Sequence, residues 1–453
     1  MLFTTQWLQK LFKKTRGDLQ QSIDIHQVTT DSREPSYQGL FIPLIGEHFD
    51  GHQFIFDAIE RGAVAALWQG DRPLPDTLNP SFPIFYVDDT LVALQELAAT
   101  YRQLVDPIVI GITGSNGKTT TKDLVTSVVQ TQFQTHATEG NFNNHIGLPL
   151  TILGMPRHTE ILVLEMGMNN YNEINRLTDI ARPDYAIITN IGESHIEFLG
   201  SRAGIAQAKL EIIHGMDQQG VLIIDGDDPL LTEKNYPLHL IRCGFQLDND
   251  VSLKLKSISI AQTVFHLLDE DRLYTVPLAG KHHAKNAAFA VIIGRKLNIS
   301  VENIQKGLEQ CNHTGMRFET VMGRNGVTII NDAYNASPTS MKAAIEVVKH
   351  LNGFKHKVLV LGDIFELGHY AEELHRSVAS AIDAHITVLF TYGKHAKHIV
   401  EAVDEQLVNL NRQHFTSQEE LTKALEPYLK PDTVILCKAS RGMQFETIVH
   451  ALQ

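Results

Sequence analysis

The feature that most constrains the fold is a glycine-rich segment, GITGSNGKTT, at residues 111–120. The apolar run Ile108-Val109-Ile110 precedes it, and a helical pattern begins at about Thr119. In such a strand–turn–helix connection, glycines let backbone N–H groups curl around phosphate oxygens, and the helix N-terminus adds a favourable dipole. Lys118 supplies a charge and the Thr119 hydroxyl a magnesium ligand. The segment predicts a phosphate-binding loop for ATP.

The loop is a variant, because the strict pattern would place a glycine at position 112, where this chain has Ile112. An ordinary glycine-rich turn is the alternative interpretation. The Gly-Lys-Thr-Thr ending in this context favours the phosphate loop. We expect its nucleotide contacts to come from Gly114, Ser115, Asn116, Gly117, Lys118, Thr119 and Thr120.

Length and composition limit the remaining possibilities. A chain of 453 residues exceeds one ordinary core, so three domains are expected. The net charge of −13 disfavours a nucleic-acid surface, and no apolar run is long enough to predict a signal peptide or a membrane span. Three scattered cysteines, without CxxC spacing, suggest neither disulfides nor a zinc site. These features predict a cytoplasmic protein.

The order of apolar and helical segments predicts an α/β fold with three domains, at residues 1–104, 105–314 and 315–453. The first mixes short strands with turns and ends in a helix over 90–104. The second alternates strands and helices as βαβ units around a parallel sheet. The third repeats that alternation and is expected to be Rossmann-like. The strands expected in the last two domains are 108–110, 161–164, 185–189, 221–224, 327–330, 358–361, 387–390 and 433–436, with third-domain helices at 337–350 and 370–384.

Three further side chains are candidates for the site. Glu165 ends a predicted strand and His195 lies just beyond another, so both are expected at the sheet edge where ligands bind. Taken singly, a strand-end glutamate or histidine is more often a surface or capping group. Lys209 lies on a predicted helix, and by itself it reads as a solvated lysine paired with a nearby acid.

Nine segments together resemble the Mur ligase superfamily, in the order that family shows and over essentially the whole chain. They are GITGSNGKTT (111–120), TEGNFNNHIGLP (138–149), LEMGMN (164–169), TNIGESH (189–195), GIAQAKLEI (204–212), AGKHHAKNA (279–287), GMRFE (315–319), NDAYNASPTSM (331–341) and LGDIFELG (361–368). The last two look like the branch that joins D-alanyl-D-alanine to UDP-N-acetylmuramoyl-tripeptide.

The resemblance implies an ATP-dependent carboxylate–amine ligase of peptidoglycan precursor synthesis, acting through an acyl phosphate. The first domain would bind the UDP substrate and the second ATP. The third would bind the amine substrate and close on ATP by a large hinge rotation. The expected partners are UDP-N-acetylmuramoyl-tripeptide and D-alanyl-D-alanine, with ATP and two Mg²⁺ ions, and the chain is expected to be a monomer.

The resemblance also implies roles for individual residues. Lys118 would contact ATP phosphates, Thr119 and Glu165 one magnesium ion, and His195 a second. Lys209 falls where the family carries a carbamylated lysine that helps to hold magnesium. Adenine, phosphate and ribose would contact Asn286, Arg317 and Asp332, with Tyr334 and Asn335 nearby. The muramoyl substrate would contact Asp31, Ser32 and Arg33 at its uridine end, and Asn143 and Asn144.

Two alternatives stay open from the sequence. Another amide ligase of the superfamily, such as a tripeptide-forming, folylpolyglutamate-type or lipid-linked-precursor enzyme, would share the nucleotide domain. A non-catalytic ATP-binding switch would share the phosphate loop without ligation. The sequence also leaves open whether the third residue of the peptide is lysine or diaminopimelate.

Overall fold

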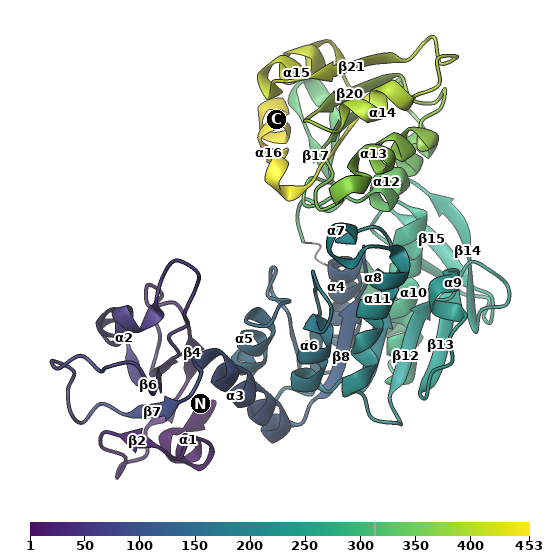
Figure 1. The fold of residues 1–453 in the computed structure, drawn as a ribbon. Coiled ribbons are helices and arrows are strands. Elements are labelled where there is room, and N and C mark those ends of the chain that lie inside the picture. The colour runs from purple at the N-terminus through teal and green to yellow at the C-terminus, as the bar shows by residue number, and fades with distance from the viewer. Residues whose placement is uncertain (312–313) are drawn as a thin grey trace.

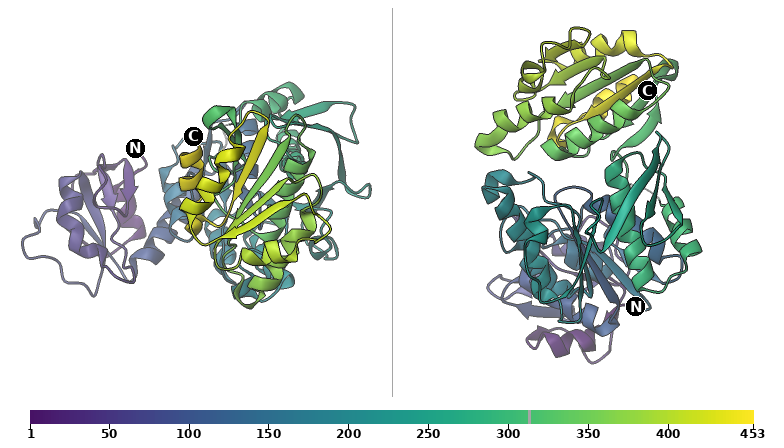
Figure 2. Two further views of the ribbon diagram at one scale, coloured as in Figure 1. Left: turned by 90° about the horizontal axis from the view of Figure 1, so that it is seen from above. Right: turned by 90° about the vertical axis from the view of Figure 1, so that its right-hand side faces the viewer.

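The computed structural model describes residues 1–311 and 314–453. They form three α/β units, each built on its own sheet, arranged as an N-terminal unit, a central unit and a C-terminal unit (Figure 1). The N-terminal unit stands to one side of the central one, and the C-terminal unit covers one end of it, as the two further views also show (Figure 2). The three-unit α/β architecture is therefore as the sequence predicts.

The N-terminal unit has a five-stranded sheet in the order β2-β7-β6-β5-β4. Within this sheet the pair β2–β7 is antiparallel and the other pairs are parallel, and β1 and β3 form a separate antiparallel pair. Its elements are β1 (Phe3–Thr4), α1 (Thr5–Leu11), β2 (Thr15–Arg16), β3 (Asp24–Ile25), β4 (Gln27–Thr29), β5 (Gly39–Phe41), α2 (Ile55–Glu60), β6 (Ala63–Gln69) and β7 (Ile84–Val87).

Helix α3 (Thr90–Val105) joins the first two units, within one residue of the predicted end. Its first turn is capped by Asp89, whose Oδ1 accepts hydrogen bonds from the N–H groups of Leu91 and Val92 at 2.7 and 2.9 Å. The phenol of Tyr101 donates to the carbonyl of Met155, which lies after α5 (Gly147–Gly154) in the central unit, at 2.9 Å. Buried side chains of α3 thus belong to a core that both units share.

The central unit has a nine-stranded sheet in the order β16-β15-β14-β13-β12-β11-β8-β10-β9. Neighbouring strands from β9 to β14 are parallel, as expected, whereas β14, β15 and β16 form an antiparallel meander. The strands are β8 (Ile108–Thr113), β9 (Thr135–Ala137), β10 (Ile161–Glu165), β11 (Tyr185–Ile188), β12 (Val221–Asp225), β13 (His239–Gly244), β14 (Val251–Ile258), β15 (Thr263–Leu267) and β16 (Leu273–Val276). The predicted parallel sheet is thus present, and the antiparallel meander extends it at an edge for which the sequence analysis predicted no strands; there Lys254 and Lys256 of β14 are exposed.

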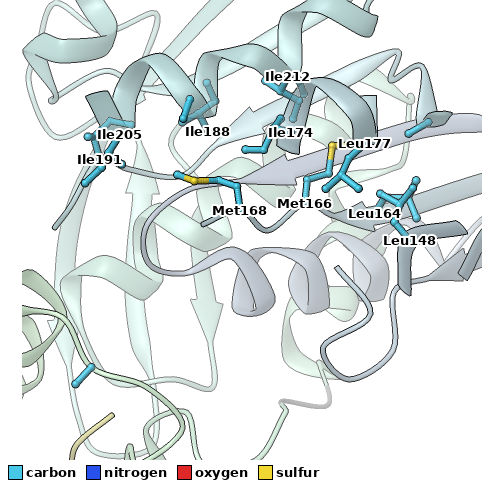
Figure 3. Packing of buried hydrophobic residues seen from close by; sticks show 14 of the residues in the cluster. Leu148, Leu164, Met166, Met168, Ile174, Leu177, Ile188, Ile191, Ile205 and Ile212 are labelled. Atoms are coloured by element: carbon cyan, nitrogen blue, oxygen red, sulfur yellow. The ribbon is translucent and has the colours of Figure 1, made fainter. Parts of the chain in front are cut away.

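Helices cover both faces of the central sheet because each inner strand sends alternate side chains to opposite sides. Ile110 and Ile112 of β8 enter one core with α4 (Lys118–Val129) and α10 (Lys281–Lys296), and Leu162 and Leu164 of β10 enter the other. In the second core, Ile205 lies beside Ile191, and Ile212 lies beside Ile174 (Figure 3). The remaining central helices are α6 (Glu173–Ala181), α7 (Ile196–Leu199), α8 (Arg202–Leu210), α9 (Pro229–Thr232) and α11 (Val301–Glu309).

The C-terminal unit has a six-stranded sheet in the order β17-β18-β22-β19-β20-β21, parallel except for β17–β18. The predicted helix over 370–384 is shorter than expected: α13 ends at Val378, a 3-10 turn follows, and Ile382 is extended. The strands are β17 (Glu319–Met322), β18 (Thr328–Asn331), β19 (His356–Gly362), β20 (Val388–Tyr392), β21 (Asn411–Phe415) and β22 (Thr433–Lys438). The helices are α12 (Pro338–His350), α13 (Ala371–Val378), α14 (Lys397–Ala402), α15 (Gln418–Leu425) and α16 (Glu446–Leu452).

Among the helices of the described residues, none combines the length and hydropathy that crossing a bilayer requires.

The core beneath α4 should limit the stability of the central unit. Leu124 is fully buried there, so Leu124→Ala should lower the free energy of unfolding by about 2–5 kcal/mol through lost burial and a residual cavity. Urea denaturation followed by circular dichroism measures this. Leu247→Ala is the matched control, since Leu247 of the same unit is 82% exposed, and its unfolding curve should stay within error of the wild type.

Candidate active site

A cavity of about 570 Å³ lies between the central and C-terminal units. The phosphate loop, the residues after β10 and β11, and α10 line it from the central side. The C-terminal unit contributes the residues around β17, β18 and β22. The predicted residues on its wall are Ser115, Asn116, Gly117, Lys118, Thr119, Thr120, Asn143, Asn144, Glu165, His195, Asn286, Arg317, Asp332, Tyr334 and Asn335.

The phosphate loop is held by the strand beside it. Gly114 has a φ of +149°, and a Cβ there would lie 1.9 Å from the hydroxyl of Thr189, so only glycine fits. Thr189 donates its hydroxyl hydrogen to the carbonyl of Asn116 at 2.6 Å, and the Asn190 side chain accepts from the Asn116 N–H at 3.1 Å. The loop therefore has a fixed shape and leaves the N-terminus of α4 facing the cavity.

Asn190 belongs to a quoted segment but was not predicted as a site residue. Its side chain also donates to the Asn116 carbonyl at 2.8 Å, so it holds both backbone polar groups of Asn116 in the loop.

Glu165 joins two polar side chains at the carboxyl end of β10. Its Oε2 accepts from the Thr119 hydroxyl at 2.7 Å, and its Oε1 accepts from the Asn143 amide at 2.8 Å. Glu165 is only 3% exposed. This arrangement places a carboxylate and a hydroxyl, both hard oxygen donors, at the mouth of the phosphate loop.

The described residues contain no group of three or more histidine, cysteine or acidic side chains clustered as a metal site. A magnesium ion bound together with a nucleotide needs fewer protein ligands, because phosphate oxygens and waters complete its shell. The carboxylate and hydroxyl of Glu165 and Thr119 fit such an ion.

Lys118 is a cation in a poorly hydrated position. Its Nζ donates to the Gly114 carbonyl at 2.9 Å. Burial lowers its pKa, the Glu165 carboxylate opposes that shift, and the positive Arg317 adds to it. A phosphate anion placed here would relieve the cost of both effects.

The C-terminal wall of the cavity carries a second cationic group. The Arg317 guanidinium lies 3.9 Å from the centre of the Tyr334 ring. The Lys438 amine donates to Asp332 Oδ2 at 2.6 Å and to the Asn335 carbonyl at 3.0 Å. Lys438 lies on β22, far from the other residues in sequence, so the motifs gave no signal for it. Here it holds the loop of Asp332 and Asn335 in place.

His282 faces the cavity from the first turn of α10, and it lies within the segment AGKHHAKNA (279–287) that also contains Asn286. Burial lowers the pKa of His282 to about 4, so its ring is neutral at physiological pH.

The two units meet directly over the phosphate loop. The Ser337 hydroxyl at the start of α12 donates to Asn116 Oδ1 at 3.0 Å. The Thr339 hydroxyl lies 2.8 and 2.9 Å from the two oxygens of Glu193. His195 Nδ1 lies 2.6 Å from Glu366 Oε2, and this pairing lowers the pKa of Glu366. The cavity is thus closed on one side by contacts between units.

Some predicted residues lie elsewhere. Gly114 belongs to the loop but does not line the cavity, and Lys209, 2% exposed, is buried on α8 and is not part of the cavity wall. Asp31, Ser32 and Arg33 lie in the N-terminal unit, also off this wall. There Arg33 donates to both oxygens of Asp31 at 2.8 and 2.6 Å, which lowers the Asp31 pKa to about 2.

Comparisons with known proteins agree with this geometry. Three family models match in order: "Mur ligase family, catalytic domain" at residues 24–102, "Mur ligase middle domain" at 112–294, and "Mur ligase, glutamate ligase domain" at 316–441. A UDP-N-acetylmuramoyl-tripeptide–D-alanyl-D-alanine ligase of Bacillus subtilis is 48% identical over 431 residues, covering 94% of this chain and 93% of the relative.

Two solved structures extend the likeness to the fold. MurF from Acinetobacter baumannii has a TM-score of 0.87 at 30% identity, covering 99% of this chain and 98% of its own. MurF ligase from Thermotoga maritima in complex with ADP has a TM-score of 0.82 at 28% identity, covering 94% and 97%. With the identity extending across all three units, the chain belongs to the Mur ligase family.

Proposed function

We propose that this protein is the ATP-dependent ligase that joins D-alanyl-D-alanine to UDP-N-acetylmuramoyl-tripeptide in peptidoglycan precursor synthesis. One observation carries the proposal: a phosphate loop, a carboxylate–hydroxyl pair and two cationic side chains of another unit face one cavity. The 48% identity to a relative of that name, over nearly the whole of both chains, supports the choice of substrates.

The reaction requires activation because a carboxylate is a poor electrophile at neutral pH. A carboxylate oxygen of the tripeptide attacks the γ-phosphorus of ATP, the bond to the β-phosphate oxygen breaks, and an acyl phosphate and ADP result. The amine of the dipeptide then attacks the acyl carbon. A proton leaves the nitrogen, the C–O bond to phosphate breaks, and the amide and inorganic phosphate are released.

The residues of the cavity suit the first transfer, in which charge builds on the γ-phosphoryl oxygens. Lys118 and the loop N–H groups would hold the phosphates, and Arg317 would approach from the opposite wall. Magnesium ions, when bound, neutralise phosphate charge and polarise the phosphorus. Thr119 and Glu165 would hold one such ion, and His195 would serve a second.

The remaining predicted contact residues can be assigned to parts of the substrates by their positions in the structure. Asn286, Asp332, Tyr334 and Asn335 would hold the nucleoside, since they line the cavity beyond the loop. Asn143 and Asn144 would face the reacting end of the tripeptide.

The uridine end of the substrate would reach Asp31, Ser32 and Arg33 in the N-terminal unit. This division assigns substrate binding to residues 1–104, ATP binding to 105–314, and dipeptide binding to 315–453. Because water would hydrolyse an acyl phosphate, the C-terminal unit should close before transfer.

The cell compartment and assembly state are part of the same proposal. Three buried cysteines, Cys243, Cys311 and Cys437, and the use of ATP support action in the cytoplasm. The phosphate loop and the facing Arg317 belong to the same chain, so a monomer could hold the whole of the proposed ATP site.

Lys209 would act in a modified form. Burial, and next the charge of Lys118, lower its pKa well below the ordinary 10.5. Among the described residues, neither a carboxylate nor a hydrogen bond offsets these two effects on the amine. A neutral amine can attack carbon dioxide, forming an N–C bond and releasing a proton, to give a carbamate. That anion would offset the charge of Lys118 and offer oxygens to magnesium.

The central prediction concerns ATP consumption. Purified protein with ATP, Mg²⁺, UDP-N-acetylmuramoyl-tripeptide and D-alanyl-D-alanine should release phosphate and form the pentapeptide product in equal amounts. Mass spectrometry and a phosphate assay measure both. Omitting the dipeptide should stop sustained release, whereas dipeptide-independent turnover or no turnover would contradict the proposal, the latter favouring an ATP-binding switch.

The depressed pKa of Lys209 has a measurable effect on stability. The unfolded chain binds a proton at this amine below pH 10.5, whereas the folded chain binds it only at a lower pH. Between these two pKa values, the amine therefore lowers the free energy of unfolding more and more as the pH falls. In carbon-dioxide-free buffer, Lys209→Met should therefore be more stable than wild type. The margin should grow by about 1.4 kcal/mol per pH unit in the window. Urea denaturation at pH 10 and pH 7 tests it, and a constant margin would argue against the shift.

The carbamate role predicts an activity loss with a characteristic rescue. Lys209→Ala should lower kcat by about 10- to 100-fold or more, as losses of metal-supporting groups do, and added short carboxylic acids should restore part of it. Lys306→Ala, at an exposed lysine of the same unit, should keep full turnover. Unaltered kcat in the Lys209 variant would remove this residue from the mechanism.

A further inference from the structure

The contact between His195 and Glu366 crosses from one unit to another at the wall of the cavity. His195 precedes α7 of the central unit, and Glu366 follows β19 of the C-terminal unit. The two atoms that meet, Nδ1 and Oε2, are 2.6 Å apart. His195 is the more buried partner, with its side chain 19% exposed against 44% for Glu366. A sequence separation of 171 positions hides this pair from any local motif.

This contact fixes which nitrogen of the ring faces the C-terminal unit. Nδ1 lies at ion-pair distance from the carboxylate, without the alignment of a hydrogen bond, and this leaves the second ring nitrogen, Nε2, outside the contact. In metal sites, such a carboxylate on the far side of a histidine selects the tautomer, orients the ring and raises its basicity.

The backbone at both residues is unusual. His195 has a φ of +65° and Glu366 a φ of +60°, a left-handed conformation that side-chain-bearing residues rarely adopt. Each such residue costs roughly 1 kcal/mol and persists only where its surroundings determine it. Two left-handed residues facing each other across a unit boundary indicate that the pairing geometry is built into both loops.

Other contacts fix the same two loops against each other. The Glu197 N–H donates to the Glu366 carbonyl at 3.2 Å, and the Tyr370 phenol donates to the Gly200 carbonyl at 3.0 Å. Gly368 has a φ of +53° and lies against Glu197. The segment 365–370 therefore packs against α7, and the position of Glu366 relative to His195 depends on these contacts.

We infer that Glu366 is a positioning residue: its carboxylate holds the His195 ring with Nδ1 toward the C-terminal unit, so that Nε2 is left for the metal of the nucleotide. This role rests on the proposed function, in which His195 serves a magnesium ion. His195 is therefore correctly oriented for the metal only when the C-terminal unit is in contact with the central unit. ATP-bound metal and the closed arrangement then stabilise each other, because each is bound more tightly in the presence of the other.

Metal affinity tests this role without turnover. Mn²⁺ replaces Mg²⁺, and the electron paramagnetic resonance signal of free Mn²⁺ is titrated against the full-length protein with an ATP analogue carrying a methylene between the β- and γ-phosphorus. Glu366→Ala should weaken Mn²⁺ binding by about 10- to 100-fold, the usual effect of losing such a partner. Mn²⁺ affinity equal to wild type in this variant would overturn the role.

A matched variant separates positioning from simple loosening of the interface. Tyr370→Phe removes a hydrogen bond between the same two loops but does not touch His195, and its Mn²⁺ affinity should stay within twofold of wild type. In the His195→Gln background, Glu366→Ala should weaken binding no further, since its effect passes through the ring. Equal losses in the Glu366 and Tyr370 variants, or additive losses with His195→Gln, would refute the inference.

The same measurement distinguishes two kinds of failure. Wild-type protein that retains no Mn²⁺ with the analogue would contradict both the metal part of the proposed function and this inference. Normal ligation with unaltered Mn²⁺ affinity in Glu366→Ala would leave the proposed function intact and remove only the role of Glu366.

Discussion

Parallel pairing of β8 with β10 on one side and β11 on the other is the constraint on which the site depends. The register places Glu165 beside Ile112 and Ile188 beside Thr113, so the three strands end at one level. The residues that follow or end these strands therefore meet at one edge of the sheet. This alone brings the carboxylate to the Thr119 hydroxyl and the Thr189 hydroxyl to the phosphate loop.

The charges around the cavity contrast with the rest of the molecule. The chain carries a net charge of −13. The positive side chains of Lys118, Arg317 and Lys438 nevertheless line the same cavity, and Lys209 is buried outside its wall. Repulsion between Lys118 and Arg317 and the loss of hydration both make this arrangement costly without a partner anion. A polyphosphate would offset those costs. Nucleotide binding should for this reason also favour contact between the central and C-terminal units.

Patterns local in the sequence were predicted well. The strand entering the phosphate loop, helix α3, and the helix after Ser337 are present within a few residues of the expected bounds, because apolar periodicity and capping act over short distances. The meander β14–β16 and the strands β17 and β21 were missed. They are short or half-exposed, and polar residues such as Lys254 and Lys256 interrupt their apolar pattern. Pairing with neighbours, rather than local preference, decides that these segments are strands.

The sequence by itself determined the phosphate loop, the α/β class and the order of the three units. Each follows from glycine positions, apolar runs and motifs that act along the chain. Only the tertiary structure decided that Lys438 holds Asp332, that Glu366 faces His195, and that Lys209 is buried away from the cavity wall. These contacts join residues more than 100 positions apart or depend on burial. Long-range contacts and burial both depend on how the sheets and units pack, and a local sequence pattern does not contain that information.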